Sequence, residues 1–226
     1  MPTTEPTDVW IFFDAKAIYF SARCKDSHPE REVVTELRRD NNNIFQNDNF
    51  SVVLDTFNDQ RNGFMFQTNP VGAVRDQAIV DSANVESWNT IWDIRTNRTS
   101  EGWTVEIAIP FKSLRYAAPG PQVWGVNYRR IIKWKNEIAH QSPMPASFGT
   151  TALSRMDYAG TLLGVEAPAQ SRNLELKPYL TASSTTDLTA RTPFRNDGKA
   201  NTGFDFKYGL TRGLILDTTV NTDFAQ

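Results

Sequence analysis

The chain has 226 residues, of which 39% are hydrophobic and 22% charged, so it can bury a core the size of one large β domain. Its net charge of −2 excludes the basic surface that nucleic-acid binding requires. Cys24 is the only cysteine, which excludes an intrachain disulfide and a zinc site built from cysteines. No apolar run reaches the roughly 18 residues that predict a transmembrane helix.

Residues 8–26 predict a β-hairpin. Apolar and polar residues alternate on both sides of a turn at residues 14–16, and Ile18, Phe20 and Cys24 fall on one face. Cys24 is therefore predicted to be a small buried hydrophobe, because nothing near it in the sequence would stabilise a thiolate.

Short alternating segments continue along the chain and are separated by Asn, Asp, Gly and Pro. They predict strands at 49–55, 62–68, 90–96, 102–109 and 124–134. Residues 29–40 predict one weak helix, and residues 110–116 a single turn begun by Pro110. The pattern predicts an all-β fold, an antiparallel β-sandwich of the jelly-roll or immunoglobulin type over residues 8–166. The expected core contains Phe20, Phe50, Val52, Leu54, Phe66, Trp103, Val105 and Ile107.

The composition changes near residue 167, where residues 167–173 have the small-residue and proline content of a linker. Beyond it, aromatic positions alternate with polar ones, as at Phe204, Phe206 and Tyr208. Segments of about ten such residues are typical of an outer-membrane β-barrel, of which residues 174–226 supply only the first strands. The alternative is a pair of ordinary surface hairpins. We expect this segment to pack loosely, outside a sandwich domain at 1–166.

Three segments carry a resemblance to a known family: "VWIFFDAKAIYFSARCKD", "DNFSVVLDTFNDQRNGFMFQTNPVGAVRD" and "WDIRTNRTSEGWTVEIAIPFKSLRY". The chain resembles a family 9 carbohydrate-binding-module-like (DOMON-like) domain. More closely, it is similar to the periplasmic domain that precedes a large barrel in a family of uncharacterised bacterial outer-membrane proteins. This implies a fragment, with further strands and a signal peptide upstream of Met1.

The resemblance implies a non-catalytic module that binds glycan or polysaccharide and is associated with carbohydrate catabolism. It implies a place in the cell envelope of a Gram-negative bacterium, at the periplasmic face of the outer membrane, with the chain's own barrel as partner. Two alternatives stay open. The domain could cap or gate that barrel without a sugar ligand, or serve as an accessory part of a glycoside hydrolase.

Sugar binding requires flat aromatic faces for stacking and hydrogen-bonding groups at their rim. If sugar binds, Phe45 and either Trp88 or Trp92 are expected to be partly exposed and to face one groove. The candidates for sugar contact are Phe45, Trp88, Trp92, Trp134 and Gln67.

The resemblance assigns Phe45 to the aromatic position that precedes an acidic strand in family 9 modules. It also implies a glutamate where Ser51 stands and an arginine where Gln67 stands. The second tryptophan of that family's clamp has no counterpart, and Leu153 lies about there. Half of the clamp and much of its polar rim are therefore replaced.

The stretch "DTFNDQRNG" at residues 55–63 permits two interpretations. Asp55 and Asp59 could supply oxygen ligands to calcium, although the order of an EF-hand loop is not met. The favoured interpretation is a hairpin connection, because Asn and Asp side chains bond their own backbone in turns. No other cofactor is expected, and we expect calcium to leave the melting temperature unchanged.

Catalytic constellations are not found in the sequence. Glycosidases need two carboxyl groups facing each other across a cleft, and no such pair follows from the spacing here. The two histidines, His28 and His140, form no Ser/His/Asp grouping and no metal-binding spacing. Haem held by Met65 and a histidine is disfavoured, because Met65 alternates with phenylalanines as a packing residue would. The chain is predicted not to be an enzyme.

Overall fold

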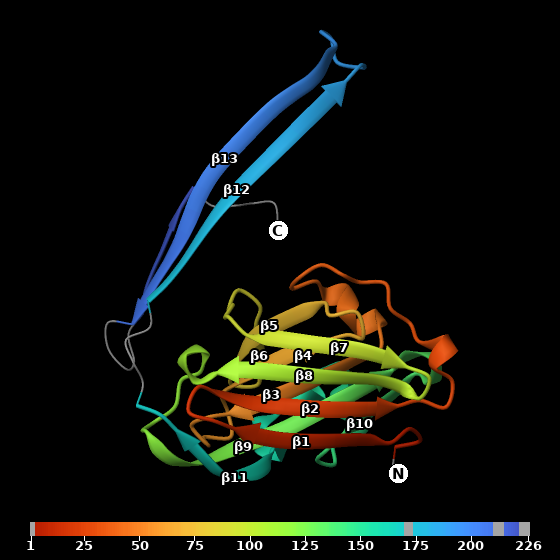
Figure 1. The fold of residues 1–226 in the computed structure, drawn as a ribbon, viewed down its shortest axis with the longest axis vertical. Helices are drawn as coiled ribbons and strands as arrows, with labels where there is room; N and C mark the ends of the chain where they lie inside the picture. The colour runs from red at the N-terminus through yellow and green to blue at the C-terminus, as the bar shows by residue number, and fades with distance from the viewer. Residues whose placement is uncertain (1–2, 170–173, 210–214, 222–226) are drawn as a thin grey trace. The chain divides into compact units, whose positions relative to one another are not determined.

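The computed structural model describes residues 3–169, 174–209 and 215–221. The chain divides into two compact units, Met1–Ala169 and Gln170–Gln226, each of which is built of antiparallel strands (Figure 1). Within the described ranges, no helix has the length and apolar character needed to cross a bilayer.

The smaller sheet of the first unit has four strands in the order β1-β2-β8-β7 (Figure 1). The predicted hairpin at its start is present, and a tight turn at residues 14–16 joins the first two strands. The strands are β1 (Thr7–Phe13), β2 (Ala17–Lys25), β7 (Asp93–Thr99) and β8 (Gly102–Pro110).

The larger sheet has seven strands in the order β10-β9-β3-β4-β5-β6, with β11 also paired to β9. The long strand β9 thus pairs with β11 along its first half and with β10 along its second half. The strands are β3 (Asn49–Asp55), β4 (Gly63–Thr68), β5 (Val74–Val80), β6 (Ala83–Val85), β9 (Gly120–Ile132), β10 (Glu137–His140) and β11 (Gly160–Ala167).

In the described part of the first unit, six short 3-10 helices lie between these strands. They are η1 (Pro29–Arg31), η2 (Asn42–Gln46), η3 (Phe111–Ser113), η4 (Lys133–Lys135), η5 (Ala146–Ser154) and η6 (Met156–Tyr158). The predicted helix over residues 29–40 is wrong, since beyond η1 this segment has no regular structure. Side chains from the two residues before β3 fix it instead: Asp48 accepts the amide of Val33, and Asn47 accepts the amide of Thr35.

The core lies between the inward faces of the two sheets. All eight predicted core residues belong to it, and Phe20, Phe50 and Phe66 have no exposed surface. Cys24 is also buried there, as predicted, and burial raises the pKa of its thiol to about 12. The all-β sandwich prediction is confirmed.

A second apolar cluster lies on the opposite face of the larger sheet. It contains Val53, Met65, Ile79, Leu153 and Met156, all 1% exposed or less. Leu153 and Met156 come from η5 and η6, so this connection covers part of the sheet's outer face. The remainder of that face carries the polar residues described below.

The second unit is one three-stranded sheet, β12 (Leu174–Asp187), β13 (Phe194–Gly209) and β14 (Ile215–Val220). Its cross-strand pairs place apolar residues opposite one another, as in Phe206 opposite Leu176 and Tyr208 opposite Leu216. Charged residues alternate with them, and Lys207 forms an ion pair with Asp217 at 3.4 Å. This sheet is therefore amphipathic, and several of its apolar side chains are exposed.

Truncating Phe50 tests the core. Phe50→Ala removes a fully buried ring and is expected to lower the free energy of unfolding by about 3–5 kcal/mol, measured by urea denaturation. Phe57→Ala is the control, because Phe57 is 49% exposed in the β3–β4 turn. Its effect is expected to stay within roughly 0.5 kcal/mol. Equal effects of the two substitutions would contradict the assigned core.

A shortened chain tests the independence of the first unit. Ala167 is buried in the core and pairs with Gly120, and the Tyr116 hydroxyl donates to the Pro168 carbonyl at 2.8 Å. A chain ending at Ala169 is therefore expected to unfold cooperatively with an unchanged melting temperature. A chain ending at Glu166 loses these contacts and should melt lower. Unfolding of the chain that ends at Ala169 would show that later residues belong to the core.

Candidate functional site

A line of polar side chains crosses the outer face of the larger sheet from β10 to β5. Residues directly opposite in adjacent antiparallel strands point to the same face. The register pairs His140 with Arg129, Arg129 with Ser51, Ser51 with Gln67, and Gln67 with Arg75. We call these five residues the polar row.

Side-chain hydrogen bonds join two pairs of residues within the polar row, Arg75 with Gln67 and Arg129 with Ser51. Arg75 Nη1 donates to Gln67 Oε1 at 3.3 Å, and Gln67 Nε2 donates to Asn49 Oδ1 at 3.1 Å. Arg129 Nη2 donates to Ser51 Oγ at 3.3 Å. Arg129, Ser51, Gln67 and Arg75 are all 3% exposed or less. The row is therefore a buried polar network rather than a solvated surface.

The ring of Phe45 lies against the polar row. It comes from η2, and the guanidinium carbons of Arg75 and Arg129 lie 5.0 and 5.2 Å from its centroid. The Phe45 side chain is half-buried, and its carbonyl accepts a hydrogen bond from Lys133 Nζ at 3.2 Å. Such contacts between cations and a ring are favourable, more so when water is excluded. The structure thus brings Phe45 and Gln67 into one site.

Burial controls the protonation of the charged residues in the row. Burial, together with the nearby charge of Arg75, lowers the pKa of Arg129 to about 10, so Arg129 still carries its charge at neutral pH. Burial, and then the charge of Arg129, lowers the pKa of His140 to about 4, so His140 is neutral there. The row therefore contains two cationic donors and one neutral imidazole at pH 7.

Trp88 and Trp92 lie on the other side of the same sheet. Trp92 is 6% exposed, packs against Phe66 in the core, and donates its indole N–H to Asp76 at 3.1 Å. Trp88 is half-buried and packs on Phe64 at 4.9 Å between centroids. Because both pack against the core, they do not share a groove with Phe45, contrary to the expectation from the sequence.

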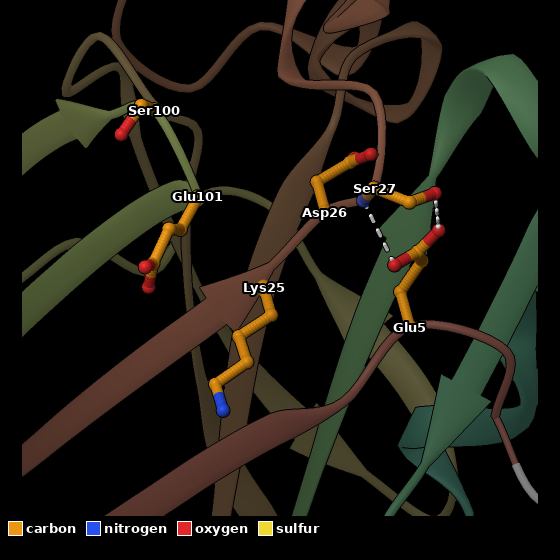
Figure 2. A pocket seen from close by; sticks show the side chains of 6 residues that line it. All are labelled: Glu5, Lys25, Asp26, Ser27, Ser100 and Glu101. Carbon is orange, nitrogen blue, oxygen red and sulfur yellow. Dashed lines mark hydrogen bonds between the residues drawn. The ribbon is translucent and has the colours of Figure 1, made fainter.

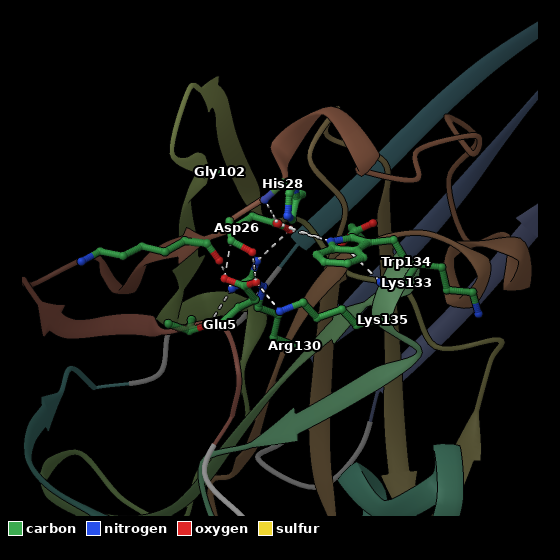
Figure 3. Close-up of polar contacts among 12 residues, drawn as sticks. Glu5, Asp26, His28, Gly102, Arg130, Lys133, Trp134 and Lys135 are labelled. Atoms are coloured by element: carbon green, nitrogen blue, oxygen red, sulfur yellow. Dashed lines mark hydrogen bonds and ion pairs between the residues drawn. The ribbon is translucent and has the colours of Figure 1, made fainter.

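Trp134 belongs to a separate polar cluster near the end of β2 (Figure 3). Its indole Nε1 lies 3.3 Å from both carboxylate oxygens of Asp26, and His28 contacts its ring edge-on. Two cations, Arg31 and Lys135, lie over the ring at 5.2 and 4.8 Å. These contacts occupy Trp134 within the protein, and none of them involves the polar row.

A cleft of about 440 Å³ opens beside this cluster (Figure 2). Its lining residues are Glu5, Lys25, Asp26, Ser27, Ser100 and Glu101. The carboxylate of Glu5 accepts hydrogen bonds from the Ser27 amide and hydroxyl, and Asp26 accepts the amide of His28. None of these six lining residues is aromatic, so the described lining lacks the stacking surface that sugar recognition uses.

Asp55 and Asp59 shape the turn between β3 and β4. Asp55 accepts the amides of Asp59 and Gln60 at 3.2 and 2.7 Å, and Asp59 accepts those of Arg61 and Asn62 at 2.9 and 2.8 Å. This is the arrangement expected of a hairpin connection. Among the described residues, no group of three or more His, Cys, Asp or Glu is arranged for a metal ion. That calcium leaves the melting temperature unchanged stays a prediction.

Three members of the polar row, Arg75, Arg129 and His140, were not predicted from the sequence. Arg129 lies in the predicted strand 124–134, where alternation with Tyr128 would have placed it on the outward face. Arg75 lies in β5, a strand that was not predicted. His140 joins the row only because β10 pairs with β9.

The first unit is a two-layer antiparallel sandwich. The family described as carbohydrate family 9 binding domain-like matches residues 4–153, and the chain belongs to this family. Domains of this family are non-catalytic, in agreement with the prediction that the chain is not an enzyme. No curated protein matches the chain.

Solved structures similar to this one include a protein from Bacteroides uniformis provisionally assigned to carbohydrate binding. It has 11% identity and a TM-score of 0.59, with 72% of this chain and 79% of that chain covered. Two others are family 9 modules from Caldicellulosiruptor kristjanssonii. The complex with cellotriose has 14% identity and a TM-score of 0.48, with 76% of this chain and 79% of that chain covered. The complex with glucose has 15% identity and a TM-score of 0.49, with 76% of this chain and 82% of that chain covered.

His140 provides a pH-dependent test of the polar row. Its pKa is about 4 in the folded protein and about 6.5 when unfolded, so the unfolded chain binds more protons between these values. The free energy of unfolding therefore falls as the pH is lowered from about 6.5 to about 4. His140→Gln should flatten this dependence by on the order of 1–2 kcal/mol, allowing for partial exposure.

The measurement is urea denaturation at a series of pH values. His28→Gln is the matched control, because it removes the chain's other histidine, which lies outside the row. An identical pH dependence of wild type and His140→Gln would show that burial and Arg129 do not act on His140 as described.

Proposed function

We propose that the chain binds a glycan at the polar row, with Phe45 as its stacking surface. The observation that carries this proposal is the position of one aromatic ring against a buried line of hydrogen-bonding side chains. Membership of a family of carbohydrate-binding-like domains supports it. Sugars have apolar C–H faces that stack on rings and hydroxyl groups that need donors and acceptors.

Binding requires the ring of Phe45 to move, because the row beneath it is almost fully buried. Phe45 lies in the five-residue 3-10 helix η2 and takes no part in strand pairing. The ring swings outward in the proposed complex and stacks on the sugar, and the donors of Arg75, Gln67 and Arg129 then face the ligand. A buried polar site of this kind discriminates strongly, since a ligand that cannot pair with its groups leaves them unsatisfied.

Phe45→Ala tests this proposal by isothermal calorimetry with xylo-, cello- and uronic-acid-containing oligosaccharides. Loss of the stacking surface should weaken binding by about tenfold or more, equivalent to about 1.4 kcal/mol. Phe57→Ala is the control, because it removes an exposed phenylalanine from the β3–β4 turn. Absence of heat with every glycan at millimolar concentration, or unchanged affinity in Phe45→Ala, would contradict the proposal.

The proposal extends to the second unit and to location. The domain is a module at the periplasmic face of a Gram-negative outer membrane, acts in carbohydrate catabolism, and neighbours a barrel that begins in residues 174–226. The amphipathic sheet β12-β13-β14 supports this, because its apolar side chains need a covering surface. Fractionation of Gram-negative cells that express the protein tests the location.

A second candidate function is a capping or gating domain without a sugar ligand. Its support is the closed state of the polar row, in which Phe45 already occupies the two guanidinium groups. Such a domain would give no heat with glycans and would bind its own barrel in a pull-down experiment.

A further inference from the structure

We infer that the polar row selects an acidic sugar, one whose carboxylate binds between the guanidinium groups of Arg129 and Arg75. This inference rests on the proposed glycan-binding function and adds the chemical class of the ligand. It follows from an imbalance of charge in the row.

Within the described part of the chain, Arg129 carries a buried charge that pairs with no carboxylate. The residue is 1% exposed, and its Nη atoms donate to neutral acceptors, the Thr150 carbonyl at 2.9 Å and Ser51 Oγ at 3.3 Å. Its Nε has no acceptor among the residues that the structure describes. A buried charge is costly unless it is both paired and hydrogen-bonded. Arg129 meets neither condition in full.

Arg75 increases this imbalance. Its Nη2 contacts Glu86 Oε1 at 3.2 Å and Asn42 Oδ1 at 2.7 Å, but the Glu86 side chain is 62% exposed. Asp40 also attracts Arg75, but it forms an ion pair with Arg39 at 3.0 Å. The positive charge of Arg75 is therefore only partly neutralised, because Glu86 is exposed to solvent and Asp40 also pairs with Arg39. The remaining titratable member of the row, His140, is neutral and supplies no negative charge.

An anion would bind both guanidinium groups at the position that the Phe45 ring now occupies. Its ring lies close to both guanidinium groups, and a ring supplies only a weak electrostatic partner to a cation. When the ring swings outward to stack on a sugar, this place becomes open to the ligand. A planar carboxylate matches the guanidinium fork with two parallel hydrogen bonds. A neutral sugar hydroxyl would leave the charge of Arg129 uncompensated.

The ligand class that combines a stacking face with a carboxylate is a uronic acid residue within an oligosaccharide. A sulfated sugar carries the same charge but presents tetrahedral oxygens. The two anions are separated by experiment, with the planar carboxylate as the expected ligand.

The test compares three ligands with the same sugar ring: tri-galacturonate, its methyl ester, and a sulfated galactose trisaccharide. Calorimetry with the wild-type chain should give at least about tenfold tighter binding of the acid than of the ester. Arg129→Gln should reduce this ratio toward one, and Arg61→Gln, which removes an exposed arginine paired with Asp81, should preserve it. The ratio of the affinities for acid and ester is measured on the wild-type chain, so it tests the inference even if Arg129→Gln unfolds.

Each other result overturns the inference in a distinguishable way. Equal affinity for acid and ester leaves the glycan-binding function intact and refutes selection by charge. Tighter binding of the sulfated ligand than of the acid refutes the planar carboxylate. Absence of binding by every ligand, including the neutral xylo- and cello-oligosaccharides, refutes the glycan-binding function itself.

Discussion

The pairing of β3 with β9 is the constraint on which both the core and the polar row depend. Asn49–Asp55 pairs with residues 125–131, and every residue of β3 is buried. Side chains alternate along a strand, so this register sends Phe50, Val52 and Leu54 to the core and Ser51 to the outer face. A slip of one residue would set the polar face of one strand against the apolar face of the other. The same hydrogen bonds therefore select the core and assemble the site.

The strands with clean alternation could be predicted from the sequence, and those with polar residues on both faces could not. The hairpin of residues 8–26 and the segment 102–109 follow from their pattern alone. β5 was missed because Arg75, Asp76 and Gln77 are consecutive polar residues, all buried by partners distant in the sequence. The helix over residues 29–40 was wrong for a related reason. Its local apolar spacing is overridden by hydrogen bonds that its backbone amides donate to the side chains of Asn47 and Asp48.

The site could be predicted only in part. Phe45 and Gln67 were found through the resemblance, but the arginines beside them converge through strand pairing, which no local motif encodes. The tryptophans were misleading because a large ring with a hydrogen-bonded N–H is as useful in a core as at a binding surface. Trp92, bonded to buried Asp76, illustrates this. An aromatic residue in a sequence therefore has to be assigned to a face before it can be assigned a role.

The burial of Cys24 makes the chain's only thiol unreactive toward thiol reagents. A thiol that ionises near pH 12 presents almost no thiolate to a maleimide or a disulfide reagent at neutral pH. A cysteine introduced at an exposed position would then be the only reactive one. Gln46, the exposed neighbour of Phe45 at the end of η2, is such a position. A fluorophore attached there would report displacement of the turn that carries Phe45 without prior removal of the native cysteine.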